Sequence, residues 1–270
     1  MRCALASVCD RAALQTLWKV CFGDDTAYTN LYFDRYDISQ RVFVAREGAT
    51  IAAMAIWFPA TLADADGEEI PAAYLYAVAT APQFRHRGVC RDLMAFAEKH
   101  LKALGVQAVT LVPGSSELFR FYEKLGYQTA FFCREIKVTV PQAGIAIRPI
   151  SANRYWQLRQ MLLWQDFLSY DEEEIAYQKA ICRHAGGDLV QLQLKDQLAC
   201  AIAEPQGAQL MVKEVLPPEV AEQVGAALLA RFGGKSAIVR TCGTQKAFGM
   251  IKWLRSAKLC QAAYLGLAFD

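Results

Sequence analysis

The chain has 270 residues, of which 54% are hydrophobic and 21% charged, so it can bury one large core or two smaller ones. Its net charge of +2 gives no long-range attraction to nucleic acid. No apolar run approaches the roughly 20 residues that a helix needs to cross a bilayer, so no membrane partner is expected. The nine cysteines form neither a C-x-x-C pair nor a cluster with histidine, which argues against a metal site. Their odd count and the absence of a secretion signal predict a cytoplasmic location.

The first part of the chain predicts two helices followed by three strands. Asp10 suits a helix N-cap, and a second helix is expected over Thr26–Tyr36. The aromatic residues of these helices either line a pocket or pack in the core. Strands are predicted over Arg41–Arg46 and Thr50–Phe58, and a third over Ile70–Thr80.

A strand, a basic turn and a helix follow one another at the centre of the first half. Aromatic and β-branched residues favour the strand up to Thr80, and apolar residues then recur at helical spacing up to Leu104. The turn between them reads Arg85-His86-Arg87-Gly88-Val89-Cys90-Arg91. Glycine lets the backbone approach a ligand closely, the first amides of a helix point outward, and the arginines add positive charge. The pattern predicts a phosphate or pyrophosphate site, with a solvated turn as the alternative.

A second strand and a second helix come next in the chain. The strand is expected over Val106–Val112, and Ser115 or Ser116 suits the N-cap of the helix. The helix ends in the sequence Phe121-Tyr122-Glu123-Lys124-Leu125-Gly126-Tyr127. A last strand or hairpin is predicted over Tyr127–Val140.

Together these two stretches resemble the GNAT (Gcn5-related) acyl-CoA N-acyltransferase family. The acyl-CoA loop of that family, Q/R-x-x-G-x-G/A, is matched by Arg85-x-x-Gly88-x-Cys90, and its phrase FYEKLGF is matched by Phe121–Tyr127. The resemblance implies an α/β fold with a mixed, mainly antiparallel sheet flanked by helices. Two positions depart from the pattern: Cys90 stands where the family usually has Gly or Ala, and Ser115 stands where many members have Asn.

The resemblance also implies an activity and its residues. The expected reaction is transfer of an acetyl group from acetyl-CoA to a primary amine of a small molecule or peptide. Tyr122 occupies the position of the general acid in the family. A phenol with a pKa near 10 is protonated at neutral pH and can therefore donate a proton. The alternative is that Tyr122 only packs against the sheet. The implied cofactor-binding residues are Val78, Ala79 and Thr80 on the strand, Arg85, His86, Arg87, Gly88, Val89, Cys90 and Arg91 in the loop, and Ser115.

Three features favour the alternative of a non-catalytic acyl-CoA-binding or interaction protein on the same scaffold. The first two are the departures at Cys90 and Ser115. A helix N-terminus can lower the pKa of a thiol, but the place of Cys90 in the loop indicates a phosphate contact rather than a nucleophile. The third is the lack of an evident general base, because Glu68 and Glu69 lie beside a turn and His86 lies inside the loop.

The second half predicts nearly the same order of elements as the first. Helices are expected over Ser151–Leu168, from Asp171 onward, over Pro218–Phe232 and over Ala247–Leu254, and strands over Leu189–Leu194, Gln197–Glu204, Gln209–Leu216, Lys235–Thr241 and Ala262–Phe269. This order predicts a duplication, with a catalytic domain over residues 1–140 and a degenerate GNAT-like domain over residues 145–270 that shapes the acceptor pocket.

The second copy lacks the features that would bind an acyl-CoA. Its equivalent turn, Leu216-Pro217-Pro218-Glu219-Val220, has neither glycine nor arginine, and two prolines remove amides. Glu214, on the preceding strand, is expected to be a paired structural charge, with a pocket carboxylate as the alternative. Trp156, Trp164 and Trp253 are expected in the core.

Overall fold

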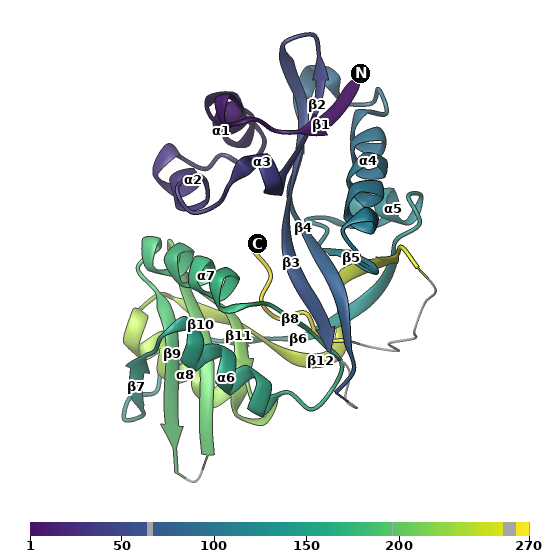
Figure 1. Ribbon diagram of the computed structural model, residues 1–270. Coiled ribbons are helices and arrows are strands. Elements are labelled where there is room, and N and C mark those ends of the chain that lie inside the picture. Colours follow the sequence, from purple (N-terminus) through teal and green to yellow (C-terminus); the bar gives the residue numbers. More distant parts are fainter. Residues whose placement is uncertain (64–66, 196, 256–262, 270) are drawn as a thin grey trace. The chain divides into compact units, whose positions relative to one another are not determined.

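The computed structural model describes residues 1–63, 67–195, 197–255 and 263–269, which form two compact units (Figure 1). Unit 1 contains residues 1–60 and 70–128 together with the described residues 251–255. Unit 2 contains residues 129–250, the described part of 61–69, and residues 263–269. Each unit is therefore discontinuous in sequence.

Unit 1 is built on a mixed sheet. Its strand order is β1, β2, β3, β4, β5 and then the last residues of β12. β1 with β2 and β2 with β3 pair antiparallel, whereas β4 and β5 pair parallel. The bounds are β1 Arg2–Leu5, β2 Val42–Glu47, β3 Thr50–Ala63, β4 Glu69–Thr80, β5 Ala108–Leu111 and β12 Ser236–Trp253. A mixed, mainly antiparallel sheet flanked by helices confirms the predicted fold class.

The helices of unit 1 follow the local signals of the sequence closely. Helix α1 (Arg11–Phe22) follows the 3-10 turn η1 (Val8–Asp10) and ends at Gly23, whose φ is +87°. The second predicted helix is shorter than expected: α2 (Thr26–Phe33) ends early, and α3 (Ile38–Arg41) begins after Asp37, whose side chain accepts from the Ser39 amide at 2.9 Å.

Helix α4 (Val89–Ala103) makes the crossover between the parallel strands β4 and β5. It follows the 3-10 turn η2 (Pro82–Phe84), and its buried face consists of Val89, Leu93, Met94, Ala97 and Leu101. This face has the helical spacing predicted from the sequence, and α4 packs on β1 and β2. After β5 comes helix α5 (Ser116–Glu123), whose N-cap is Ser115 as predicted.

Unit 2 has the same order of five strands. The order is β7, β9, β10, β11, β12, and the last two pair parallel while the others pair antiparallel; β6 also pairs with β12. The bounds are β6 Gln128–Val138, β7 Ala146–Pro149, β8 Phe167–Ser169, β9 Asp188–Leu194, β10 Gln197–Gln206, β11 Gln209–Leu216, α6 Ala152–Leu162, α7 Glu172–His184, η3 Pro218–Val220 and α8 Ala221–Phe232. A cluster of buried aliphatic side chains lies between α8 and the strands β9–β12.

Three expectations about the second half are wrong. The helix predicted over Ser151–Leu168 ends at Leu162, and β8 follows it. The segment Ala247–Leu254 is the end of strand β12 rather than a helix, because sheet pairing overrides a weak local helical preference. Trp164 is 86% exposed and Trp156 is 37% exposed, so neither lies in the core. The predicted strand Ala262–Phe269 begins outside the described residues, and within them only Ala263 and Tyr264 form bridges.

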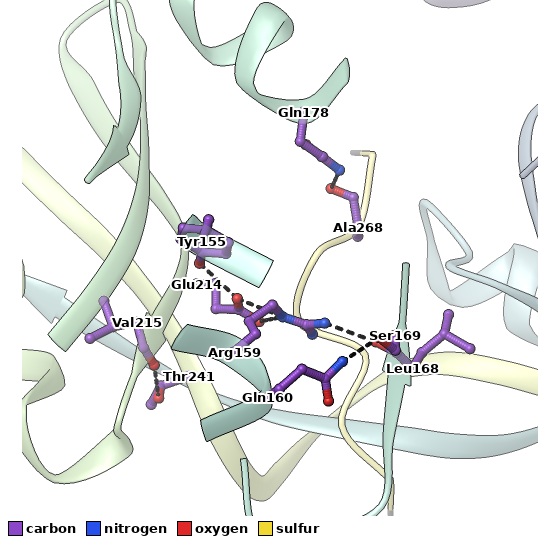
Figure 2. Close-up of polar contacts among 10 residues, drawn as sticks. All are labelled: Tyr155, Arg159, Gln160, Leu168, Ser169, Gln178, Glu214, Val215, Thr241 and Ala268. Atoms are coloured by element: carbon purple, nitrogen blue, oxygen red, sulfur yellow. Dashed lines mark hydrogen bonds and ion pairs between the residues drawn. The ribbon is translucent and has the colours of Figure 1, made fainter. Parts of the chain in front are cut away.

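A buried polar cluster lies inside unit 2 (Figure 2). The Glu214 carboxylate accepts hydrogen bonds from the Tyr155 hydroxyl at 2.7 Å and from Nε of Arg159 at 2.9 Å. Arg159 also donates from Nη1 to the carbonyl oxygen of Leu168 at 3.1 Å. The Arg159 and Glu214 side chains are 1% and 0% exposed, so Glu214 is the paired structural charge that was predicted.

The chain's own C-terminal segment covers this cluster. Residues 264–269 are buried, and Nε2 of Gln178 donates to the carbonyl oxygen of Ala268 at 3.0 Å (Figure 2). At Gly266 a Cβ atom would lie 2.1 Å from Oε1 of Glu214, so only glycine lets the backbone pass there. The chain itself therefore covers the buried pair of Glu214 and Arg159.

Candidate active site

The site in unit 1 begins where strand β4 leaves its parallel partner. The register of β4 with β5 ends at the pair Leu75–Leu111, and β4 then continues alone on that side to Thr80. Ala77 lies just beyond this point with a φ of +47°, a left-handed conformation that a non-glycine residue rarely adopts. The backbone at Val78–Thr80 is therefore not paired with β5 and is available on that edge for an extended ligand.

The basic loop follows this free edge and is held in a strained conformation. His86 has a φ of +60° and Gly88 a φ of +78°, both in the left-handed region. Gly88 is the N-cap of α4, where the first amides of a helix have no intrahelical partner. A Cβ atom on Gly88 would lie 2.9 Å from Nη2 of Arg91, so the Arg91 guanidinium folds back over the glycine.

A cavity of about 480 Å³ connects this edge and loop with helix α5. Ten of the predicted site residues line it: Val78, Ala79, Thr80, Arg85, His86, Gly88, Val89, Cys90, Arg91 and Tyr122. These residues lie between positions 78 and 122, on β4, the basic loop, α4 and α5, and the fold of unit 1 brings them to one cavity. Its remaining walls are Cys21, Phe22, Phe84, Leu118 and Phe121.

Arg85 is positioned at the end of the free edge. Its Nε donates to the carbonyl oxygen of Thr80 at 3.1 Å, and its Nη2 lies 3.9 Å from the sulfur of Cys21. Cys21 in turn donates to the same carbonyl at 3.6 Å. These contacts fix an exposed guanidinium beside the mouth of the cavity, where it adds to the positive end of the α4 dipole.

Two predicted residues lie apart from the cavity lining. The Arg87 guanidinium pairs with Glu47 at 2.7 Å and lies 5.2 Å from the centre of the Phe84 ring. The Ser115 hydroxyl caps α5 by accepting from the Leu118 amide at 3.4 Å. Their direct contact with a cofactor stays a prediction.

Tyr122 projects into the cavity from the last turn of α5. Only 6% of the residue is exposed, and its ring meets that of Phe121 at 5.2 Å and that of Tyr127 at 5.7 Å between centroids. Burial raises the pKa of the Tyr122 phenol, and the nearby Cys90 thiol adds to the rise. The phenol therefore stays protonated at neutral pH, as a proton donor must.

Cys90 lies on the cavity wall near the start of α4. Burial raises the pKa of its thiol to about 11, against a smaller lowering by a hydrogen bond with the Thr80 side chain. The effect of desolvation exceeds that of the helix N-terminus, so the pKa is not lowered. Cys90 is therefore a neutral thiol on the cavity wall at physiological pH, which agrees with its reading as a non-nucleophilic residue.

Sequence reasoning missed the apolar walls and the residues behind Tyr122. Cys21 and Phe22 come from the end of α1, some sixty residues before the loop, and no motif marks them. Tyr127 donates from its hydroxyl to Glu98 at 3.0 Å, and Glu98 also accepts from Lys252 at 2.6 Å. The only available signal was Tyr127, which has a hydroxyl where the family phrase ends in phenylalanine.

The arrangement fits a ligand that joins a pyrophosphate to an extended arm. The left-handed glycine, the outward amides of α4 and the Arg85 and Arg91 guanidiniums suit the anion. The unpaired edge at Val78–Thr80 suits the arm, and a protonated phenol lies at the same cavity. Within the described ranges, no group of three or more His, Cys, Asp or Glu side chains converges so as to hold a metal ion. Among the same residues, no helix has both the length and the apolar character needed to cross a membrane.

Comparison with known proteins agrees with this geometry. Residues 10–130 match the family model of the acetyltransferase (GNAT) domain. That span contains β4, the basic loop, α4 and Tyr122, so the site lies within the residues that resemble this domain. No curated protein matches the chain.

Solved structures share the fold over nearly the whole chain. The GCN5-related N-acetyltransferase from Kribbella flavida aligns with a TM-score of 0.67 at 15% identity, over 93% of this chain and 70% of that one. The GCN5-related N-acetyltransferase from Anabaena variabilis gives 0.70 at 14% identity, over 94% and 73%. A probable N-acyltransferase from Enterococcus faecalis gives 0.67 at 15% identity, over 94% and 72%. At these identities the likeness establishes the fold, and the family match supports an acyltransferase role.

Proposed function

We propose that the chain is an N-acetyltransferase that transfers the acetyl group of acetyl-CoA to a primary amine of a small molecule or peptide. The observation that carries the proposal is the single cavity that joins the β4 edge, the basic loop and Tyr122. The membership of residues 10–130 in the GNAT acetyltransferase model supports the class of reaction.

The loop and the strand would bind the cosubstrate. The amides at the start of α4, with Arg85 and Arg91, would hold the pyrophosphate, and Gly88 leaves room for its close approach. The free edge of Val78, Ala79 and Thr80 would pair with the pantetheine arm. The bound acetyl-CoA supplies an activated thioester, and backbone N–H groups of the same edge would polarise its carbonyl.

Tyr122 would act as the general acid. Amine attack on a thioester expels a thiolate, which needs a proton. The Tyr122 phenol carries one at neutral pH because burial raises its pKa. Holding the donor at the cavity wall turns a bimolecular proton transfer into a positioned one.

The second unit is proposed to be a degenerate copy of the first. The support is the shared strand order, with a parallel final pair and a proline-initiated 3-10 turn before the crossover helix in each unit. On this reading residues 1–140 hold the catalytic domain and residues 145–270 the degenerate one, which shapes the acceptor pocket. A cytoplasmic location remains part of the proposal.

Calorimetric titration with acetyl-CoA tests the binding site. Arg85→Gln combined with Arg91→Gln is expected to weaken binding at least about tenfold, because each guanidinium would lose a charge-assisted contact. Arg87→Gln provides the matched comparison, and its effect should be smaller because Glu47 already holds that side chain. Failure of the unaltered protein to bind acetyl-CoA would overturn the proposal.

A turnover assay then distinguishes an N-acetyltransferase from a non-catalytic acyl-CoA-binding protein. The assay detects free CoA thiol released from acetyl-CoA with spermidine, kanamycin, L-lysine and a tripeptide amine as acceptors. Tyr122→Phe should lower kcat by about 10²–10⁴ while acetyl-CoA binding persists. Binding by the unaltered protein without turnover on any amine would favour the non-catalytic acyl-CoA-binding alternative.

A further inference from the structure

A hydrogen-bonded group of three side chains lies behind Tyr122 in unit 1. The Tyr127 hydroxyl donates to Oε1 of Glu98 at 3.0 Å, and Nζ of Lys252 donates to Oε2 at 2.6 Å. Lys252 also lies 5.5 Å from the centre of the Tyr127 ring. Tyr127 is 3% exposed, and the Glu98 side chain is 12% exposed. The bond between Tyr127 and Glu98 is therefore largely shielded from water, whereas the Lys252 side chain is 26% exposed.

Three segments that are distant in sequence meet in this group. Glu98 belongs to α4, the helix that begins at the basic loop, and it lies eight residues, or about 12 Å, after Cys90 along that helix. Tyr127 directly follows the turn that ends α5. Lys252 comes from β12, 154 residues after Glu98. The group thus ties the cofactor-loop helix to the segment that carries Tyr122.

Tyr127 connects this group to Tyr122 through direct contacts. Its amide donates to the Tyr122 carbonyl oxygen at 3.1 Å, and the two rings meet edge to face at 5.7 Å and 64°. Burial raises the pKa of the Tyr127 phenol, and the Glu98 charge raises it further, so Tyr127 stays a hydrogen-bond donor. A phenylalanine would fill the same space against Tyr122. The hydroxyl therefore adds only the bond that fixes the ring to α4.

We propose that Glu98, Tyr127 and Lys252 are positioning residues that set the Tyr122 phenol relative to the cofactor loop. The inference rests on the proposed function, in which Tyr122 donates a proton to the leaving thiolate. It implies that the residues of β12 from Ile251 onward, which belong to unit 1, complete the active site of that unit. A displacement of about 1 Å at a reacting group can lower a rate by up to about a hundredfold.

Turnover measurements on single variants give the first test. Tyr127→Phe and Glu98→Leu are expected to lower kcat about five- to tenfold, with the KM for acetyl-CoA changed less than about twofold. Glu98→Gln keeps an acceptor for the Tyr127 hydroxyl and should restore kcat to within about twofold of the unaltered protein. Lys246→Met removes a lysine paired with Glu135 in unit 2 and is the matched control, with kcat unchanged.

The double variant Tyr127→Phe/Glu98→Leu separates positioning from stability. The double variant leaves only Lys252 of the group without its partner, and that side chain is 26% exposed, so thermal stability should recover in part relative to Glu98→Leu. If the group positions Tyr122, kcat stays low in the double variant. Recovery of kcat together with stability would overturn the proposal.

Nuclear magnetic resonance tests the same coupling without turnover. In protein with ¹³C-labelled tyrosine, the Tyr122 signal is assigned by its loss in Tyr122→Phe. The proposal expects this signal to shift in Glu98→Leu and in Lys252→Met, and to stay in place in Lys246→Met. An unmoved signal overturns the positioning role, whereas a shifted signal in a protein that transfers no acetyl group would contradict the proposed function alone.

Discussion

The connection from β4 to α4 in unit 1 and the one from β11 to α8 in unit 2 have the same plan but opposite chemistry. Each joins a strand to a helix through a 3-10 turn that begins at a proline, and each helix crosses to a parallel strand. The first turn carries arginines and a left-handed glycine. The second carries Pro217, Pro218 and Glu219, and an acidic Glu222 opens α8.

The regions beside these turns differ in what fills them. In unit 1 the edge of β4 borders an open cavity with a neutral phenol and a neutral thiol. In unit 2 the corresponding strand carries Glu214, which is neutralised by Arg159 and Tyr155 and covered by the chain's own residues 264–269. The same strand order therefore accompanies an open cavity in unit 1 and a buried ion pair in unit 2.

The largest expected effect is on the filled interior of unit 2. Arg159→Met leaves the Glu214 carboxylate buried without its ion pair, and we expect a loss of about 3–5 kcal/mol in the free energy of unfolding. The same type of substitution in unit 1, Arg87→Met, breaks the exposed ion pair with Glu47 and should lower the free energy of unfolding by about 0–1 kcal/mol. Urea unfolding followed by circular dichroism measures both.

The double variant Arg159→Met/Glu214→Leu sharpens this result. Because it removes both charges, part of the stability lost in Arg159→Met should return. Acetyl-CoA binding should be the same in both variants as long as they fold. A double variant no more stable than Arg159→Met would show that the unpaired Glu214 charge is not the main cause of the lost stability.

A smaller effect is expected from a glycine substitution that distinguishes the two units. Gly88→Ala places a Cβ atom against Arg91 and forces alanine into a left-handed conformation, which costs roughly 1–2 kcal/mol. Gly207, in the β10–β11 turn of unit 2, has a φ of +61° and open space around it, so Gly207→Ala carries a similar backbone strain. Only Gly88→Ala should weaken acetyl-CoA binding, by about tenfold. Equal titration curves for the two variants would exclude Gly88 from the binding site.

The sequence predicted the parts of this comparison that depend on local order. The free edge and the glycine turn lie within the β4–α4–β5 unit, and Tyr122 lies on α5, the next helix along the chain. Motifs that fix the spacing of these features in the sequence therefore also predict that they lie close together. Ser115 was recognised as a cap for the same reason, since its partner is the Leu118 amide three residues away. The pairing of Glu214 could be anticipated because a carboxylate on a buried strand needs a partner.

The remaining features depend on contacts between distant segments. Arg87 looked equivalent to Arg85, but Glu47, forty residues earlier, holds its side chain. The end of β12 has a weak helical pattern, and only its place beside β5 makes it a strand. Lys252 reaches Glu98 for that reason, and nothing in its local sequence indicates a role at the site.

The smallest expected effect on acetyl-CoA binding is that of substituting Cys90. Its thiol replaces a smaller residue on the cavity wall without adding charge, because burial raises its pKa to about 11. Cys90→Ala should therefore change the Kd for acetyl-CoA less than about threefold at pH 7, since only a few atoms of a neutral wall are removed. A larger gain in affinity would mean that the thiol obstructs the pyrophosphate.

The Cys90 thiol should also make the free energy of unfolding fall as the pH rises into the alkaline range. In the unfolded chain a cysteine ionises near pH 9, whereas the folded Cys90 keeps its proton up to about pH 11. The unfolded state thus binds fewer protons between these values, so the contribution of Cys90 to stability is complete below pH 9 and is lost as the pH rises to 11. Relative to the unaltered protein, Cys90→Ala should show a flatter decline of unfolding free energy over that interval, measured by urea titrations at each pH. Iodoacetamide at pH 8 should label the exposed Cys9 well before Cys90, and the opposite order would place a thiolate beside the basic loop.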